Sequence, residues 1–127
     1  MMIHVLLTQY DLLEGTGTVI AEGSGNLSGD TLIYREKAEP FYFHEVNFTD
    51  RKITLERKAE IRSVTELVPM GRGTSTVHSP FGKMELTTVL NGWSRQEDTW
   101  MVEYKVLSGD ETVLHQRLVW ELKGAAE

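Results

Sequence analysis

The sequence predicts an all-β protein, a single antiparallel β-barrel of about 8–10 strands joined by short turns. Three observations support this. Apolar or neutral side chains recur at every second residue in three successive runs between Met84 and Leu122, which is typical of strands with one buried face. No stretch shows the 3.6-residue apolar period of a helix. Residues that favour tight turns, mainly Gly, Pro, Asn and Asp, separate the runs at short intervals.

The length and composition favour one domain spanning residues 1–127. The chain has no cysteine, which excludes disulfides, thiolate zinc sites and cysteine nucleophiles. Its first ten residues have no basic start and no long apolar run. We therefore expect neither a signal peptide nor a membrane span, and a cytoplasmic location. The net charge of −6 argues against a general nucleic-acid-binding protein, which needs a basic surface.

The N-terminal part of the chain predicts six strands. Residues 2–10 alternate well enough for the first strand, and residues 11–15 form a turn. Residues 16–28 are β-branched and small, with several glycines, which predicts a long, bent strand. Glycines inside strands mark bulges or close backbone approaches. The next strands are expected at residues 31–36, 41–48, 53–57 and 61–68.

The C-terminal part predicts four more strands and two clear breaks. Residues 69–73 form a loop with two glycines and a proline, and Pro80 ends the strand that follows. Residues 108–110 form the turn before the last strand. Ala125 and Ala126 are expected to form a loose tail. The four strands are expected at residues 74–79, 84–95, 100–106 and 114–122.

One local signal conflicts with this assignment. Asn91-Gly92 is a strong hairpin signal. However, only three residues separate it from the polar turn at residues 96–99, too few to pair with residues 84–90. We therefore expect one strand that continues to Arg95, with a bulge at Gly92.

About ten antiparallel strands in one small domain would expose sheet edges unless the sheet closes or stacks on another. Closure into a barrel is the simplest solution, and a two-sheet sandwich is the alternative. No internal repeat, low-complexity segment or linker interrupts the chain.

Short stretches along the chain suggest a family. They are the Ser79-Pro80-Phe81-Gly82 turn before a long strand, the Val102-Glu103-Tyr104 stretch, and Arg57 just before a tight turn. Together with the strand order, they resemble the YwiB-like family of bacterial proteins over most of the chain. That family typically has Thr and often Tyr at the positions of Ser79 and Phe81, changes that preserve the turn. The resemblance implies a lipocalin-like, calycin-type β-barrel and implies no activity.

Motifs for catalysis, metals or cofactors are absent from the sequence. Histidines His4, His44, His78 and His115 lack the spacing of local metal-ligand pairs and are expected at the surface or at strand ends. No helix follows the glycine pairs, so they are not phosphate-binding loops. There is no Gly-x-Ser-x-Gly elbow, and the paired acids lie in turns. The sequence thus predicts no catalytic residue, metal or cofactor, and a protein that is not an enzyme.

Polar residues on the apolar faces form a candidate ligand site, because they would also point into the barrel. A guanidinium at residue 57 in an apolar interior requires a partner. That partner is either an internal acid, with Glu36 and Glu45 as candidates, or the carboxylate or phosphate of a ligand. The candidate ligand-binding residues are Arg57, Tyr104, Thr88 and Gln116.

A structural interpretation of the same residues is also open. Arg57 borders a turn and can extend to solvent, and Tyr104 and Gln116 can be core residues with local hydrogen bonds. The aromatic stretch at residues 41–48 likewise has two interpretations. It forms part of the core, or it forms a portal or dimer surface.

Three functions follow from these patterns. The first is a non-enzymatic barrel that binds a small apolar or amphipathic ligand, such as one with an anionic group, through Arg57 and Tyr104. The second is a protein-interaction or structural module with a barrel filled by side chains. The third is an enzyme that uses an acid at the barrel mouth. A lumen of several hundred Å³ favours the first. We expect a monomer or a homodimer that binds neither nucleic acid nor membranes.

Overall fold

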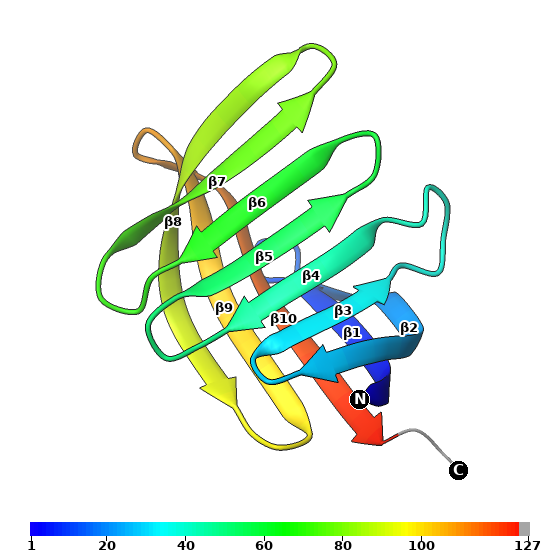
Figure 1. The fold of residues 1–127 in the computed structure, drawn as a ribbon. Helices are drawn as coiled ribbons and strands as arrows, with labels where there is room; N and C mark the ends of the chain where they lie inside the picture. The colour runs from blue at the N-terminus through cyan, green and yellow to red at the C-terminus, as the bar shows by residue number, and fades with distance from the viewer. Residues whose placement is uncertain (125–127) are drawn as a thin grey trace.

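The structure, a computed structural model, describes residues 1–124 and consists there of ten β-strands without a helix (Figure 1). The strands are β1 (Met2–Asp11), β2 (Thr16–Ser28), β3 (Thr31–Arg35), β4 (Phe43–Phe48), β5 (Ile53–Lys58), β6 (Arg62–Leu67), β7 (Arg72–Ser79), β8 (Gly82–Arg95), β9 (Thr99–Ser108) and β10 (Glu111–Gly124). The tail expected at Ala125 and Ala126 lies outside the described residues. Within residues 1–124, no helix of membrane-spanning length occurs.

Each strand pairs antiparallel with the next one, and β10 pairs with β1 along most of its length. The sheet is therefore a closed ten-stranded barrel, which removes exposed edges. The predicted all-β antiparallel barrel is confirmed. The β1–β10 pairing joins the two ends of the chain, from Ile3 opposite Gly124 to Asp11 opposite Gln116.

The last three strands follow the sequence prediction closely. The predicted bulge in β8 is confirmed, because Leu90 lies opposite Tyr104 while Gly92 lies opposite the adjacent Glu103. Asn91 is the extra residue, so the Asn-Gly pair bends the strand and does not reverse it. This keeps β8 continuous for 14 residues, long enough to pair with both β7 and β9.

The long strand β2 is bent, as its glycines predict. Its register against β1 shifts between Leu7 and Thr8. Gly25 lies where β2 approaches β3: a Cβ atom there would lie 2.7 Å from the carbonyl oxygen of Ile33 and 2.8 Å from Val5 Cγ2. Only glycine permits this approach. β3 pairs with β2 over three residues alone, so most of β2 follows β1.

Several predicted boundaries are wrong by two or three residues: β8 begins at Gly82 and β10 at Glu111, and the starts of β4 and β7 differ as well. β4 begins at Phe43, because Phe41 takes a left-handed conformation (φ 56°) in the loop before it. β7 begins at Arg72, so Gly73 lies within a strand where the sequence predicted a loop. The preceding Pro69 and Gly71 lie in the β6–β7 connection, as predicted.

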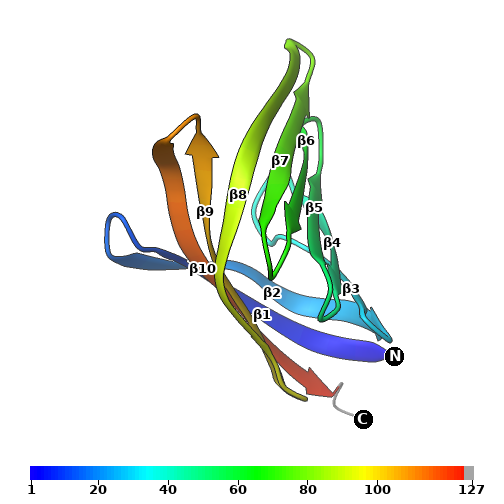
Figure 2. The same cartoon turned by 90° about the vertical axis from the view of Figure 1, so that its left-hand side faces the viewer.

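The barrel has two unlike ends. The connections β1–β2, β3–β4, β5–β6, β7–β8 and β9–β10 lie at one end, which we call the mouth end. Here the first residues of β8 pair only with β7, since the first β8–β9 pair is Thr87 with Leu107. Figure 2 shows the β7–β8 and β9–β10 hairpins leaning apart. The mouth end is consequently less fully covered by paired strands.

Apolar side chains fill the opposite end. Residues close to the ends of their strands there are at most 4 % exposed: Ile3, Leu32, Phe48, Ile53, Leu67, Trp100 and Leu122. The rings of Phe48 and Trp100 pack with centroids 5.2 Å apart. Burying such side chains is worth roughly 1.5–3 kcal/mol each. This plug of core residues closes the barrel at one end and leaves space toward the mouth end.

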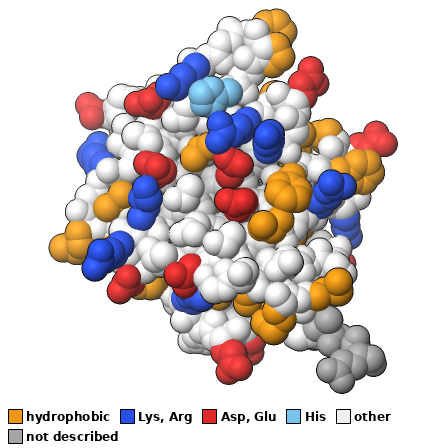
Figure 3. All heavy atoms as spheres, in the orientation of Figure 1, with side chains coloured by type: hydrophobic (Ala, Val, Ile, Leu, Met, Phe, Trp, Pro, Cys, Tyr) orange, Lys and Arg blue, Asp and Glu red, His pale blue; other side chains and the backbone are white. Residues whose placement is uncertain are grey.

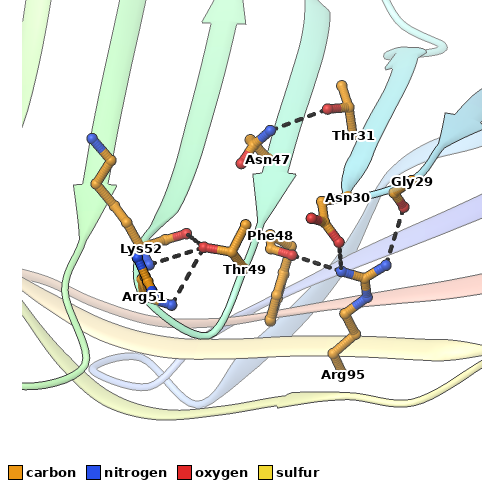
Figure 4. Close-up of polar contacts among 9 residues, drawn as sticks. All are labelled: Gly29, Asp30, Thr31, Asn47, Phe48, Thr49, Arg51, Lys52 and Arg95. Carbon is orange, nitrogen blue, oxygen red and sulfur yellow. Dashed lines mark hydrogen bonds and ion pairs between the residues drawn. The ribbon is translucent and has the colours of Figure 1, made fainter.

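Arg95 ties the connections at the plugged end together (Figure 4). It donates hydrogen bonds to the carbonyl oxygens of Phe48 (2.7 Å) and Gly29 (3.1 Å), and it pairs with Asp30. Its guanidinium carbon also lies 4.6 Å from the ring centroid of Trp100. One side chain at the end of β8 thus holds the β2–β3 turn and the end of β4 in place.

Candidate functional site

A cavity of about 450 Å³ occupies the mouth half of the barrel lumen. Its wall is predominantly apolar, with contributions from strands on both sides of the lumen. The apolar wall includes Leu7, Ile20, Leu55, Leu86, Leu114 and Trp120. A volume of this size falls within the range of small-molecule sites.

Tyr104 and Gln116 form a buried polar pair on the cavity wall. They are cross-strand partners in β9 and β10, and Gln116 Nε2 donates a 2.5 Å hydrogen bond to the Tyr104 hydroxyl. Burial raises the pKa of Tyr104 to about 12, so its phenol remains protonated at neutral pH. In either orientation of the amide, the pair retains unused hydrogen-bond donors and acceptors. The wall therefore offers hydrogen bonds without a charge.

A second uncharged pair lies on the wall formed by β6 and β7. Thr65 Oγ1 and Ser75 Oγ are 3.0 Å apart, so one hydroxyl donates to the other and the acceptor keeps its own O–H. Thr88 lies elsewhere: its fully buried hydroxyl donates a 2.6 Å hydrogen bond to the carbonyl oxygen of Glu66. The structure thus brings Arg57, Tyr104 and Gln116 to the cavity and places Thr88 outside its lining.

A charged network lies at the mouth of the cavity. Arg57 donates from Nε to Glu36 Oε2 (2.5 Å) and from Nη2 to Glu36 Oε1 (3.0 Å), a two-point ion pair. Glu36 is therefore the internal acid that the sequence offered, while Glu45 is exposed. His44 Nε2 lies 2.6 Å from the same Glu36 Oε2. The ring of Tyr42 packs 3.8 Å from the guanidinium carbon of Arg57.

Two further side chains extend this network into the core. Trp120 Nε1 donates to the Tyr34 hydroxyl at 2.7 Å, and that hydroxyl lies 3.2 Å from His44 Nδ1. A neutral His44 satisfies every group: the Tyr34 O–H donates to Nδ1, and Nε2–H donates to Glu36. The chain of contacts joins β10 to β3, β4 and the residue after β3.

The pKa directions agree with these protonation states. Burial lowers the pKa of His44 below its ordinary value, although its hydrogen bond with Glu36 acts in the opposite direction. Burial raises the pKa of Glu36, but hydrogen bonds from Arg57 and His44 together hold it below its usual range. Burial also raises the pKa of Tyr34. At neutral pH the network contains one carboxylate, one guanidinium and a neutral imidazole.

The free energy of unfolding should therefore decrease as the pH is lowered, and protonation of His44 should cause this decrease. Because its folded-state pKa lies below its unfolded value, the unfolded chain takes up the proton first as the pH falls below about 6.5. One proton contributes at most about 1.4 kcal/mol per pH unit. We expect the loss between pH 7.5 and 5.5 to be smaller in His44→Gln than in the wild type, by urea denaturation. The wild type and the variant both contain His4, His78 and His115. Parallel curves of unfolding free energy against pH would therefore contradict the role of His44.

The aromatic stretch at residues 41–48 has no single role. Phe48 is core and Tyr42 lines the cavity, whereas Phe41 and Phe43 are exposed. Exposed apolar side chains occur at or beside all five connections of the mouth end. They are Leu13, Phe41, Ile61, Phe81 and Val113. Ile61 and Val113 also line the cavity, so the path from the surface to the lumen is partly apolar.

A second hollow, about 650 Å³, lies at the plugged end between the turns, beside Phe48, Trp93 and Trp100. It is larger but more open to solvent, and Arg95 already lies over the Trp100 ring. The lumen is less open to solvent and has buried polar groups on its wall. We therefore assign the candidate site to the lumen.

Other surfaces carry less specific chemistry. Figure 3 shows acidic and basic side chains interspersed over the face of the barrel seen in Figure 1, so both signs of charge occur there. Within residues 1–124, no three His, Asp or Glu side chains gather as a metal site.

Sequence reasoning missed Tyr34, His44 and Trp120. The sequence contains part of the information needed to find Tyr34. It lies two residues before Glu36, so the two side chains are expected on the same face. Register was the missing information. The structure places His44 opposite both Tyr34 and Arg57, on neighbouring strands.

Comparisons with known proteins show the fold. No family model and no curated protein matches the sequence. Among solved structures, the chain is similar to the crystal structure of YwiB protein from Bacillus subtilis, with a TM-score of 0.63 and 14 % sequence identity. The match covers 98 % of this chain and 91 % of that chain. It supports a YwiB-like fold.

Proposed function

We propose that this protein is a non-enzymatic binding protein that holds a small, largely apolar or amphipathic molecule in its lumen. The observation that carries the proposal is the cavity of about 450 Å³ inside the mouth half of the barrel. Its mostly apolar wall with a few fixed polar groups is typical of small-molecule sites.

The polar groups have distinct roles in this proposal. Tyr104 and Gln116 orient the buried part of the ligand, because each is buried, lines the cavity and keeps unused hydrogen-bonding capacity. Arg57 lies at the mouth, about half exposed, where it meets the part of the ligand nearest to solvent. Thr88 is left out, since its hydroxyl is bound to Glu66 and does not line the cavity.

The protonation states support binding over catalysis. A tyrosine that acts as a nucleophile or base needs a lowered pKa. Burial instead raises the pKa of Tyr34 and of Tyr104. Glu36 is held by two partners, Arg57 and His44, which favour its ionised form and oppose a role as a proton donor.

Filling the cavity tests the proposal. N-phenyl-1-naphthylamine, an uncharged fluorescent amphiphile, is the probe, and Leu114→Trp places a larger side chain on the cavity wall. We expect fluorescence titration to show binding to the wild type and an affinity at least about tenfold lower in the variant. Val19→Trp is the matched control, because Val19 is exposed and does not line the cavity.

Two results would reject lumen binding. One is that the wild type gives no saturable signal with this probe. The other is that Leu114→Trp, shown by circular dichroism to be folded, binds the probe as tightly as Val19→Trp. An unchanged affinity in that pair would place the probe outside the lumen.

A further inference from the structure

We infer that the lumen selects uncharged ligands that carry a hydrogen-bonding group, and that Glu36 is the residue that excludes anions. The inference rests on the proposed function and adds the chemical class of the ligand. The sequence alone suggested the reverse, since a lumen-facing arginine suits a carboxylate or phosphate. The arrangement of Arg57 and its neighbours changes that expectation.

The Nε–Nη2 edge of the Arg57 guanidinium is already occupied. A guanidinium recognises a carboxylate through two parallel N–H···O bonds. In this protein Nε and Nη2 make both bonds to Glu36, whose side chain is 10 % exposed. The Tyr42 ring covers one face of the same guanidinium at 3.8 Å. A ligand anion would have to share this guanidinium with a buried carboxylate that already neutralises its charge.

The other charge on the cavity lining is compensated as well. Among the described residues, the acidic and basic side chains that line the cavity are Glu56 and Arg57. Arg62 donates to Glu56 Oε2 from Nε (3.1 Å) and from Nη2 (2.6 Å). The two ion pairs sum to zero, and neutral His44 adds no charge. Burying an anion without a compensating cation is unfavourable.

The inner wall instead suits an uncharged polar group. The Tyr104–Gln116 and Thr65–Ser75 pairs offer hydroxyl and amide groups and carry no charge. A ligand that made no hydrogen bond there would leave part of this wall unpaired. An aryl amine, amide, alcohol or carbonyl group on an apolar frame matches both the polar pairs and the apolar remainder of the wall.

Two dyes that differ in one sulfonate test this inference. They are uncharged N-phenyl-1-naphthylamine and its anionic analogue 8-anilinonaphthalene-1-sulfonate. We expect the wild type to bind the uncharged dye at least about tenfold more tightly. Glu36→Gln should raise the affinity for the sulfonate about tenfold and change that for the uncharged dye less than about twofold. Replacing Glu by Gln keeps the shape of the side chain and frees the charge of Arg57.

Two controls separate this effect from a change in net charge. Glu45→Gln removes the same charge from an exposed position that does not contact Arg57. It should leave both affinities at their wild-type values. The double variant Glu36→Gln, Arg57→Gln should lose the gain for the sulfonate, because the freed guanidinium is then absent.

The outcomes distinguish the inference from the proposed function. If neither dye binds the wild type, or if Leu114→Trp leaves binding intact, the proposed function fails. If the uncharged dye binds in the lumen and the sulfonate binds as tightly, the function stands and the inference is overturned. A folded Glu36→Gln variant that gains no affinity for the sulfonate also overturns it. If that variant does not fold by circular dichroism, the ratio of the two wild-type affinities decides.

Discussion

Replacing Gly73 with alanine should lower the free energy of unfolding by about 3 kcal/mol, the upper part of the usual range for overpacking. A Cβ atom at this position would lie 2.0 Å from the carbonyl oxygen of Glu66 and 2.7 Å from Thr88 Oγ1. The first of these atoms belongs to the backbone, so a side-chain rotation cannot relieve the contact. The same oxygen accepts the 2.6 Å hydrogen bond from Thr88, which the displacement would break.

The measurement is urea denaturation of Gly73→Ala beside Gly92→Ala. Gly92 lies on the neighbouring strand β8, and a Cβ atom there would meet nothing within 4 Å. The control should therefore change the free energy of unfolding by less than about 0.5 kcal/mol. Equal effects of the two substitutions would show that β7 does not approach β6 as closely as the structure has it.

Tyr34→Phe should lower the free energy of unfolding by about 2 kcal/mol. The substitution keeps the ring and removes one hydroxyl that contacts both Trp120 Nε1 (2.7 Å) and His44 Nδ1 (3.2 Å). Trp120 is 1 % exposed, so its N–H would remain buried without an acceptor. The loss of a partner for a buried donor is more unfavourable than the loss of an exposed hydrogen bond.

Urea denaturation of Tyr34→Phe and Tyr10→Phe measures this effect. Tyr10 is 38 % exposed, and its hydroxyl makes no hydrogen bond within the described part of the chain. Its substitution should fall within about 0.5 kcal/mol of the wild type. In Tyr34→Phe, the indole N–H of Trp120 should also exchange with solvent faster. A variant as stable as Tyr10→Phe, with unchanged exchange, would remove Tyr34 from the network.

Much of the fold could be predicted from the sequence because its signals are local. Alternating polarity identified the long strands that became β8, β9 and β10. Too few residues follow Asn91-Gly92 for a hairpin, which correctly predicted a bulge. The need to avoid exposed sheet edges correctly predicted a closed barrel. Gly73 was predicted in a loop, because glycines close to Pro69 are typical of a turn. In the structure this glycine instead permits a close approach between two strands.

The candidate site was only partly predictable, because its contacts depend on register and on distant strands. The alternation of apolar and polar residues predicted that Arg57, Tyr104 and Gln116 face the barrel interior, and all three line the cavity. The same pattern included Thr88, since periodicity gives the face of a strand and not the position along the lumen. The contact of Trp120 with Tyr34 spans 86 residues, a separation that no local signal reports.

The central claim is that the lumen is a ligand cavity, and methyl NMR tests it most directly. Protein with ¹³C-labelled Leu and Val methyl groups is titrated with N-phenyl-1-naphthylamine. We expect saturable shift changes at Leu86, Val106 and Leu114, which line the cavity, and none at exposed Val19. Shifts confined to Leu27, beside the hollow at the plugged end, or to Val19 would contradict a binding site in the lumen.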